Sequence, residues 1–139
     1  MIARYPFLLP HCGRALDGSP LPEFGNDFTE LDFIPKGWQD GFGIQICEEI
    51  RQALLASGNT KEEGQAALDR YRIYEIRMKN GQLLWEDTGG AEEIIEKYTE
   101  ISRHTCCGCE KPATRLHVRY KMPYCGSCGP RVANYAPIT

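Results

Sequence analysis

Two pairs of cysteines near the C-terminus have the spacing of metal ligands. The pairs are Cys106-x-x-Cys109 and Cys125-x-x-Cys128, and 15 residues separate them. Each pair can form a tight turn that directs two thiolates at one ion, and zinc takes four such ligands at tetrahedral positions. The pattern therefore predicts a zinc site made of Cys106, Cys109, Cys125 and Cys128.

The chain has seven cysteines, and the other three form no further ligand set. Cys107 lies beside two ligands and could exchange register with Cys106, although a pair from Cys107 and Cys109 has a less usual spacing. We expect Cys12 and Cys47 to be ordinary buried or surface residues. An odd number of cysteines, most of them clustered, does not indicate a disulfide framework.

A shell of four cysteines leaves no open position for a catalytic water. The nearest match to a zinc deaminase is Cys47-Glu48-Glu49 with Pro123-Tyr124-Cys125, where Tyr124 separates the proline from the cysteine. The chain has three histidines, no phosphate-binding loop, and no H-E-x-x-H or G-x-S-x-G motif. The sequence thus favours a non-enzymatic protein, and an enzyme without a recognisable motif stays open.

The segment between the two cysteine pairs is basic. From Arg115 to Met122 polar and apolar side chains alternate, which predicts a strand with one buried face and one wet face. Basic side chains on the wet face could contact phosphates, with Tyr120 or Tyr124 available for stacking, or could form an ordinary solvated face. The candidate nucleic-acid contacts are Arg115, His117, Arg119, Lys121 and Arg131.

Charge divides the chain into an acidic body and a basic C-terminal region. Residues 1–102 hold 18 acidic and 10 basic side chains, whereas residues 103–131 hold six basic side chains and Glu110 as their one acidic residue. The formal net charge of −3 hides this division. Such asymmetry indicates interaction surfaces.

Apolar periodicity predicts the elements that position these residues. A helix is predicted over 38–57, beginning between 39 and 43 because Gly41 and Gly43 weaken its first turns. Its stripe repeats every four residues and consists of Trp38, Phe42, Ile46, Ile50 and Leu54. A second main helix is predicted over 91–102.

Two local signals lie between these helices. Thr60 and Glu63 fit a capping box for a short helix that reaches about Asp69. Asn80-Gly81 separates two runs, 70–78, which is rich in β-branched and aromatic residues, and 82–86, and predicts a β-hairpin.

The sequence predicts an α+β protein with two main helices, a β-hairpin and a C-terminal four-cysteine module. Residues 1–37, with five prolines and four glycines, are expected to form an irregular wrap anchored by apolar side chains. The further predicted divisions are a small α+β domain over 38–103, a zinc-binding module over 104–131 and a tail over 132–139.

No stretch approaches the ~20 apolar residues that span a bilayer. The first ten residues are interrupted by Arg4 and two prolines, and are too short and too broken for a signal peptide. With 42% hydrophobic and 25% charged residues the composition is that of a globular protein. We expect a soluble, cytoplasmic protein.

Several motifs occur in the order seen in a known group of proteins. They are Gly37-Trp38, Asn80-Gly81-Gln82-Leu83, Ser102 and the four cysteines. In this order the chain resembles small uncharacterised bacterial and phage proteins that end in a zinc-ribbon or treble-clef module. The resemblance covers residues 34–128 and departs at Glu110, where such a knuckle often has glycine. It implies a fold and a metal, and no activity.

Two functions are consistent with these features. The first is a non-enzymatic interaction protein with a structural zinc, such as a phage- or bacteria-encoded adaptor or inhibitor that binds a protein partner through an acidic surface. The acidic residues of segment 17–49 are Asp17, Glu23, Asp27, Glu30, Asp32, Asp40, Glu48 and Glu49. The alternative is a nucleic-acid-binding protein that uses the basic zinc hairpin, although the acidic body would repel that ligand.

Overall fold

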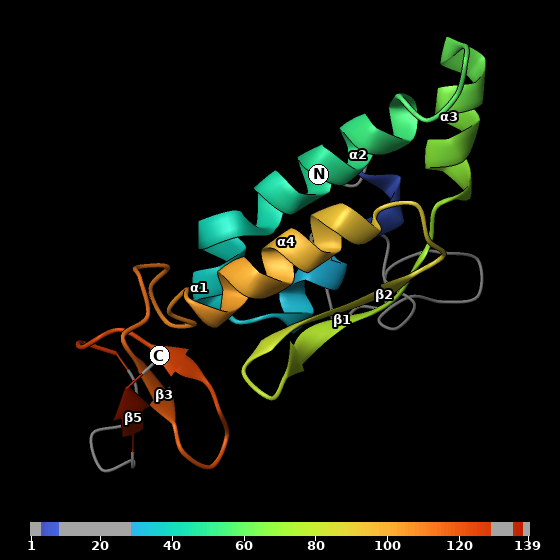
Figure 1. Cartoon of the computed structure of the whole chain (residues 1–139). Helices are drawn as coiled ribbons and strands as arrows, with labels where there is room; N and C mark the ends of the chain where they lie inside the picture. Colours follow the sequence, from blue (N-terminus) through green and yellow to red (C-terminus); the bar gives the residue numbers. More distant parts are fainter. Residues whose placement is uncertain (1–3, 9–28, 129–134, 138–139) are drawn as a thin grey trace, which may run out of the picture.

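Helices and two small antiparallel sheets make up the fold, so the predicted α+β class is confirmed (Figure 1). The computed structural model describes residues 4–8, 29–128 and 135–137. The helices are α1 (Lys36–Trp38), α2 (Ile44–Leu55), α3 (Lys61–Arg70) and α4 (Glu92–Arg103). The strands are β1 (Ile73–Lys79), β2 (Gln82–Asp87), β3 (Arg115–His117), β4 (Pro123–Tyr124) and β5 (Tyr135–Pro137).

The first main helix is a continuous run from α1 through a π-helical segment, Gln39–Gly43, into α2. All five residues of the predicted apolar stripe are buried. A spacing of four exceeds the 3.6 residues of an α-helical turn, so a plain α-helix would carry the stripe around its surface. The wider π-helical turn between Trp38 and Ile44 reduces that drift.

The predicted start of this helix, between 39 and 43, is wrong. The helical run begins at Lys36, with Pro35 at the preceding cap position. Trp38 is fully buried, and the Gly37 N–H donates to the Cys107 carbonyl at 2.9 Å. These tertiary contacts outweigh the low helix propensity of glycine.

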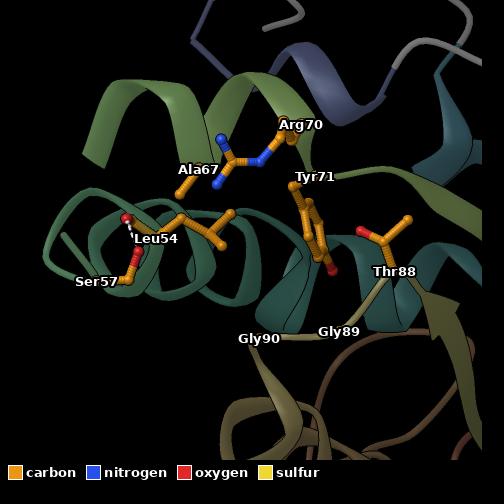
Figure 2. A pocket seen from close by; sticks show the side chains of 8 residues that line it. All are labelled: Leu54, Ser57, Ala67, Arg70, Tyr71, Thr88, Gly89 and Gly90. Atoms are coloured by element: carbon orange, nitrogen blue, oxygen red, sulfur yellow. Dashed lines mark hydrogen bonds between the residues drawn. The ribbon is translucent and has the colours of Figure 1, made fainter. Parts of the chain in front are cut away.

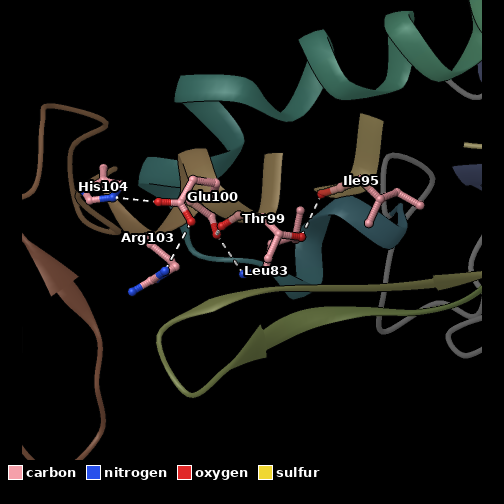
Figure 3. Close-up of polar contacts among 7 residues, drawn as sticks. Leu83, Ile95, Thr99, Glu100, Arg103 and His104 are labelled. Carbon is pink, nitrogen blue, oxygen red and sulfur yellow. Dashed lines mark hydrogen bonds and ion pairs between the residues drawn. The ribbon is translucent and has the colours of Figure 1, made fainter. Parts of the chain in front are cut away.

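The predicted hairpin and the second main helix are both present and pack together. β1 pairs with β2 from Ile73↔Asp87 to Lys79↔Gln82, and Asn80 and Gly81 have φ values of 53° and 82°, as a two-residue hairpin turn requires. Helix α4 contacts β2 and lies beside α2 (Figure 1). The Ser102 hydroxyl of α4 accepts a hydrogen bond from the Leu83 N–H at 2.8 Å, which gives one backbone donor of β2 a partner (Figure 3).

Helix α3 begins at its predicted cap. The Thr60 hydroxyl accepts from the Glu63 N–H at 3.1 Å, and the Glu63 carboxylate accepts from the Asn59 N–H at 2.5 Å. The return bond thus reaches one residue further back than in a standard capping box. α3 packs on α2 and ends at Arg70, and two residues separate it from β1, which begins at Ile73.

The N-terminal region contributes apolar side chains to the core. Those described as buried are Tyr5, Phe7, Leu8, Leu31 and Ile34, while Phe33 is exposed. Two short 3₁₀ turns, Pro6–Leu8 and Glu30–Phe33, interrupt the irregular backbone that the sequence predicts here. Leu9, Phe24 and Phe28 lie outside the described residues, and the division of the chain into domains stays a prediction.

The predicted strand over 115–122 is wrong. β3 ends at His117, and the chain reverses so that β4 can pair with β3, which is the middle strand of a sheet ordered β4-β3-β5. The Lys121 N–H donates to the His117 carbonyl at 2.7 Å and closes the turn. The chain must reverse here because the second cysteine pair has to return to the first. The alternation of polar and apolar residues continues through the turn, so it does not mark where the strand ends.

Candidate metal centre

The structure brings the four predicted ligands together. The Sγ atoms of Cys106, Cys109, Cys125 and Cys128 all lie within 4.8 Å of one another, and those of Cys109 and Cys125 are 3.5 Å apart. Zn–S bonds of about 2.3 Å in a tetrahedron place sulfurs about 3.8 Å apart, whereas a disulfide would need about 2.05 Å. All four cysteines are free thiols, and the group is compatible with a structural metal ion.

The first knuckle, Cys106 to Glu110, is a tight turn held by its own backbone. The Gly108 N–H donates to the Cys106 Sγ at 3.4 Å, and the Glu110 N–H donates to the Cys106 carbonyl at 3.2 Å. A Cβ atom on Gly108 would lie 3.2 Å from the Cys128 Sγ, so glycine leaves room for the opposing ligand. Glu110 has a φ of 69°, which is the left-handed conformation that glycine usually supplies at this position.

The second knuckle is held by an arginine side chain. Arg115 Nε donates to the Cys125 carbonyl at 3.0 Å, and Arg115 Nη2 donates to the Cys128 carbonyl. The guanidinium thus spans both ends of the second cysteine pair. The sequence predicts Arg115 as a phosphate contact and does not reveal this role. The guanidinium donates to main-chain carbonyls, which leave no pattern in the sequence.

The electrostatics of the four sulfurs favour a bound cation. The Ser127 backbone N–H lowers the pKa of Cys125 to about 6, and hydrogen bonds with the sulfurs of Cys109, Cys125 and Cys106 raise the pKa of Cys128 to about 12. Four thiolates at this spacing repel one another strongly unless a positive ion lies between them. A soft divalent cation such as zinc would remove that repulsion.

Helix α1 forms one wall of the centre, at the end of the molecule where the cysteine module (residues 104–128) lies (Figure 1). A Cβ atom on Gly37 would lie 2.2 Å from the Cys106 carbonyl oxygen, so only glycine permits this approach. The Trp38 indole Nε1 donates to the Thr105 carbonyl at 3.0 Å. Gly41 lies against Thr105 and Glu110, where a Cβ would be 3.3 Å from a side-chain atom of each.

Cys47 and Cys107 lie outside the four-sulfur group. Cys107 points into the hydrophobic core, and Cys47 is fully buried in α2, where burial raises the pKa of its thiol. The structure therefore does not bring Cys47 and Cys125 into one ligand group, as a deaminase site would need. Cys12 and Arg131 lie outside the described residues.

The basic candidates lie on different parts of the cysteine module. Arg115 is engaged in the second knuckle, whereas Arg119 and Lys121 are exposed in the turn between β3 and β4. His117 stacks against Tyr120, with ring centroids 4.9 Å apart. His104, at the end of α4, bonds to Glu100, which also pairs with Arg103 (Figure 3).

A cavity of about 320 Å³ lies between the ends of α2 and α3 and the loop that follows β2 (Figure 2). Its hydroxyl groups already have partners. The Ser57 hydroxyl donates to the Leu54 carbonyl, and the Tyr71 hydroxyl bonds to Asp87 and accepts from Trp85. The Thr88 hydroxyl accepts from the Arg72 N–H at 3.1 Å.

Comparison of the chain with protein-family models, with curated proteins and with solved structures found no match. Over the ranges that the structure describes, no helix has the length and apolar character that crossing a membrane requires. We also searched those same ranges for three or more His, Cys, Asp or Glu side chains close enough to share a metal ion. The four cysteines form the one such group there.

Proposed function

We propose that this chain is a non-enzymatic binding protein whose four cysteines hold one structural zinc ion. The observation that carries this proposal is the group of four sulfurs within 4.8 Å of one another. Four thiolates are the usual shell of a structural zinc site. A shell filled by four protein ligands leaves no position for a reactive water, so the ion would act in folding and not in catalysis.

The ion would stabilise more than the two knuckles that ligate it. Structural zinc contributes on the order of 10 kcal/mol to the folding of small modules. Here Cys107 of the first knuckle accepts from the Gly37 N–H, and the preceding residue Thr105 accepts from Trp38 Nε1. Loss of the metal would therefore loosen the end of that helix together with the cysteine module.

The acidic side chains of segment 17–49 are weaker evidence for a protein partner than the charge of the segment suggests. Five of its acidic residues lie in the described ranges: Glu30, Asp32, Asp40, Glu48 and Glu49. Glu30 is buried, and the other four accept hydrogen bonds or form ion pairs within the chain. An adaptor or inhibitor that acts through this surface stays a prediction, and so does a bacterial or phage origin.

We also propose that the protein works in a reducing compartment such as the cytoplasm. All six described cysteines are free thiols. Thiols persist in the cytosol, whereas paired cysteines are oxidised in secretory compartments.

The two tryptophans provide a direct test of the proposed structural role. Trp38 Nε1 bonds to Thr105, next to the first ligand, whereas Trp85 Nε1 bonds to Tyr71 within the body at 2.9 Å. Removal of the metal with a chelator should shift or broaden the Trp38 indole N–H signal in a ¹H–¹⁵N spectrum and leave the Trp85 signal in place. Addition of zinc should restore the Trp38 signal. If the chelator changed neither the position nor the width of the two indole signals, this result would contradict the proposal.

A further inference from the structure

The turn that joins β3 to β4 carries an exposed aromatic stack. Tyr120 and Val118 are 58% and 47% exposed, although both are large apolar side chains. The Tyr120 ring stacks on His117 with an interplanar angle of 29°, and the Arg119 guanidinium lies 5.4 Å from the Tyr120 ring centroid. We name residues 117–121 the hairpin tip.

Hydrogen bonds hold the backbone of the hairpin tip. The His117 N–H donates to the Met122 carbonyl at 3.0 Å, and the Tyr120 N–H donates to the His117 Nδ1 at 3.1 Å. The tip also touches the β1–β2 turn, since a Cβ atom on Gly81 would lie 1.8 Å from the Lys121 carbonyl oxygen. Tyr120 therefore projects into solvent from a turn that other parts of the chain hold in place. Less conformational entropy of this turn is then lost when a ligand binds.

The charged side chains of the hairpin tip and of the residues that follow it are all basic. Residues 111–139 contain no Asp or Glu. Arg119 and Lys121 are exposed and make no ion pair with the residues that the structure describes. Lys79, the last residue of β1 and two residues before Gly81, adds a third exposed cation without an ion pair in those ranges.

We propose that the hairpin tip is a docking site for single-stranded nucleic acid. An unpaired base stacks on Tyr120 or on the Arg119 guanidinium, and Arg119, Lys121 and Lys79 face the phosphates. Exposed aromatic rings flanked by cations bind single strands because every base has a π-face and every linkage an anion. The acidic body repels the same polymer and confines it to the tip.

This site depends on the proposed function, because the metal would fold the module that presents the tip. It differs from the basic strand face that the sequence predicts, since Arg115 is engaged with the carbonyls of Cys125 and Cys128. A single strand fits better than a duplex because stacking on one projecting ring needs an unpaired base. An acidic protein surface would pair with the cations, but it would offer no ring to the exposed part of Tyr120.

The test is fluorescence anisotropy of the full-length, zinc-loaded protein with labelled oligo(dT) and oligo(rU), each compared with a duplex of equal length. We expect Tyr120→Ala to weaken single-strand binding about tenfold. We expect the double variant Arg119→Gln/Lys121→Gln to reduce the slope of log affinity against log salt by about 1.4, at roughly 0.7 for each phosphate that is no longer neutralised. Tyr74→Ala and Arg70→Gln are matched controls, because each removes an exposed side chain of the same type from the body.

The metal content of every variant is measured on the same samples, so that failure of the zinc proposal and failure of the tip proposal can be told apart. Zinc-loaded protein that binds no oligonucleotide, or that binds equally well after Tyr120→Ala, would overturn the docking site and leave the zinc proposal standing. Equal affinity for the duplex would also overturn it. Capture of poly-glutamate with the affinity of the single strand, unaffected by Tyr120→Ala, would assign the tip to an acidic protein.

Discussion

Glu110 holds a backbone conformation that suits glycine. Its φ of 69° closes the first knuckle, and its side chain is exposed. An L-residue in this region is strained by about 1–2 kcal/mol. We expect Glu110→Gly to raise the free energy of unfolding of the zinc-loaded protein by about 1 kcal/mol in urea, since the added chain entropy of glycine offsets part of the relief. Glu110→Ala is the control and should give no such gain; a less stable glycine variant would refute this account of the knuckle.

At the residue scale, the sequence predicted the cysteines that cluster but not the residues that support them. Metal chemistry fixes both the type and the spacing of ligands, so the four cysteines could be found without a structure. Arg115 acts on the carbonyls of Cys125 and Cys128, which every residue type possesses. Gly108 matters because it faces Cys128, a neighbour that only the folded chain supplies.

Gly37 is the contact between the first helical run and the first knuckle. A methyl group there would lie 2.2 Å from the Cys106 carbonyl oxygen, a backbone atom that cannot move aside cheaply. We expect Gly37→Ala to lower the free energy of unfolding by about 2–3 kcal/mol and to speed the loss of zinc to a competing chelator. Gly126→Ala, which lies within the second cysteine pair and would meet no atom within 4 Å, should behave as wild type. Equal stability of the two variants would show that α1 does not support the centre.

Glu48 links the N-terminal segment to α2. Hydrogen bonds from Arg4, Gln52 and Tyr5 lower its pKa to about 2 from the ordinary 4.5. Because the folded pKa lies below the unfolded one, these hydrogen bonds stabilise the fold above pH 4.5, and their contribution disappears as the pH falls toward 2. A ¹³C carboxyl titration should show this low midpoint for Glu48, and Arg4→Gln should move it upward. A wild-type midpoint near 4.5 would mean that the Arg4–Glu48 pair does not form in solution.

At the element scale, local patterns predicted the helices and the hairpin well. The apolar stripe, the Thr60 cap and the Asn80-Gly81 turn are all local signals, and each gave the observed element. The alternation over 115–122 misled because it runs through a turn, where Val118 and Tyr120 stay exposed. The helix start at Lys36 was missed because it depends on contacts with the distant residues Thr105 and Cys107.

At the scale of the whole molecule, the cysteine module and the body share contacts at separate places. Gly37 bonds to Cys107, Trp38 bonds to Thr105, and Gly81 meets the hairpin tip. Cys107 joins the core of the body. These contacts join residues far apart in the sequence, so no local pattern reveals them. They would couple metal binding to the stability of the body, and they contact the surface that we propose to bind nucleic acid.

Native mass spectrometry of the full chain, purified without added metal, tests the central claim most directly. The four-sulfur group should retain one zinc ion per chain, and this species should persist in Cys107→Ala while Cys109→Ala loses it. Cys107→Ala is the matched control because Cys107 adjoins the ligands and lies outside their group. A wild-type chain that carries no metal, with all its thiols free to react, would contradict the structural zinc centre and the proposed function that depends on it.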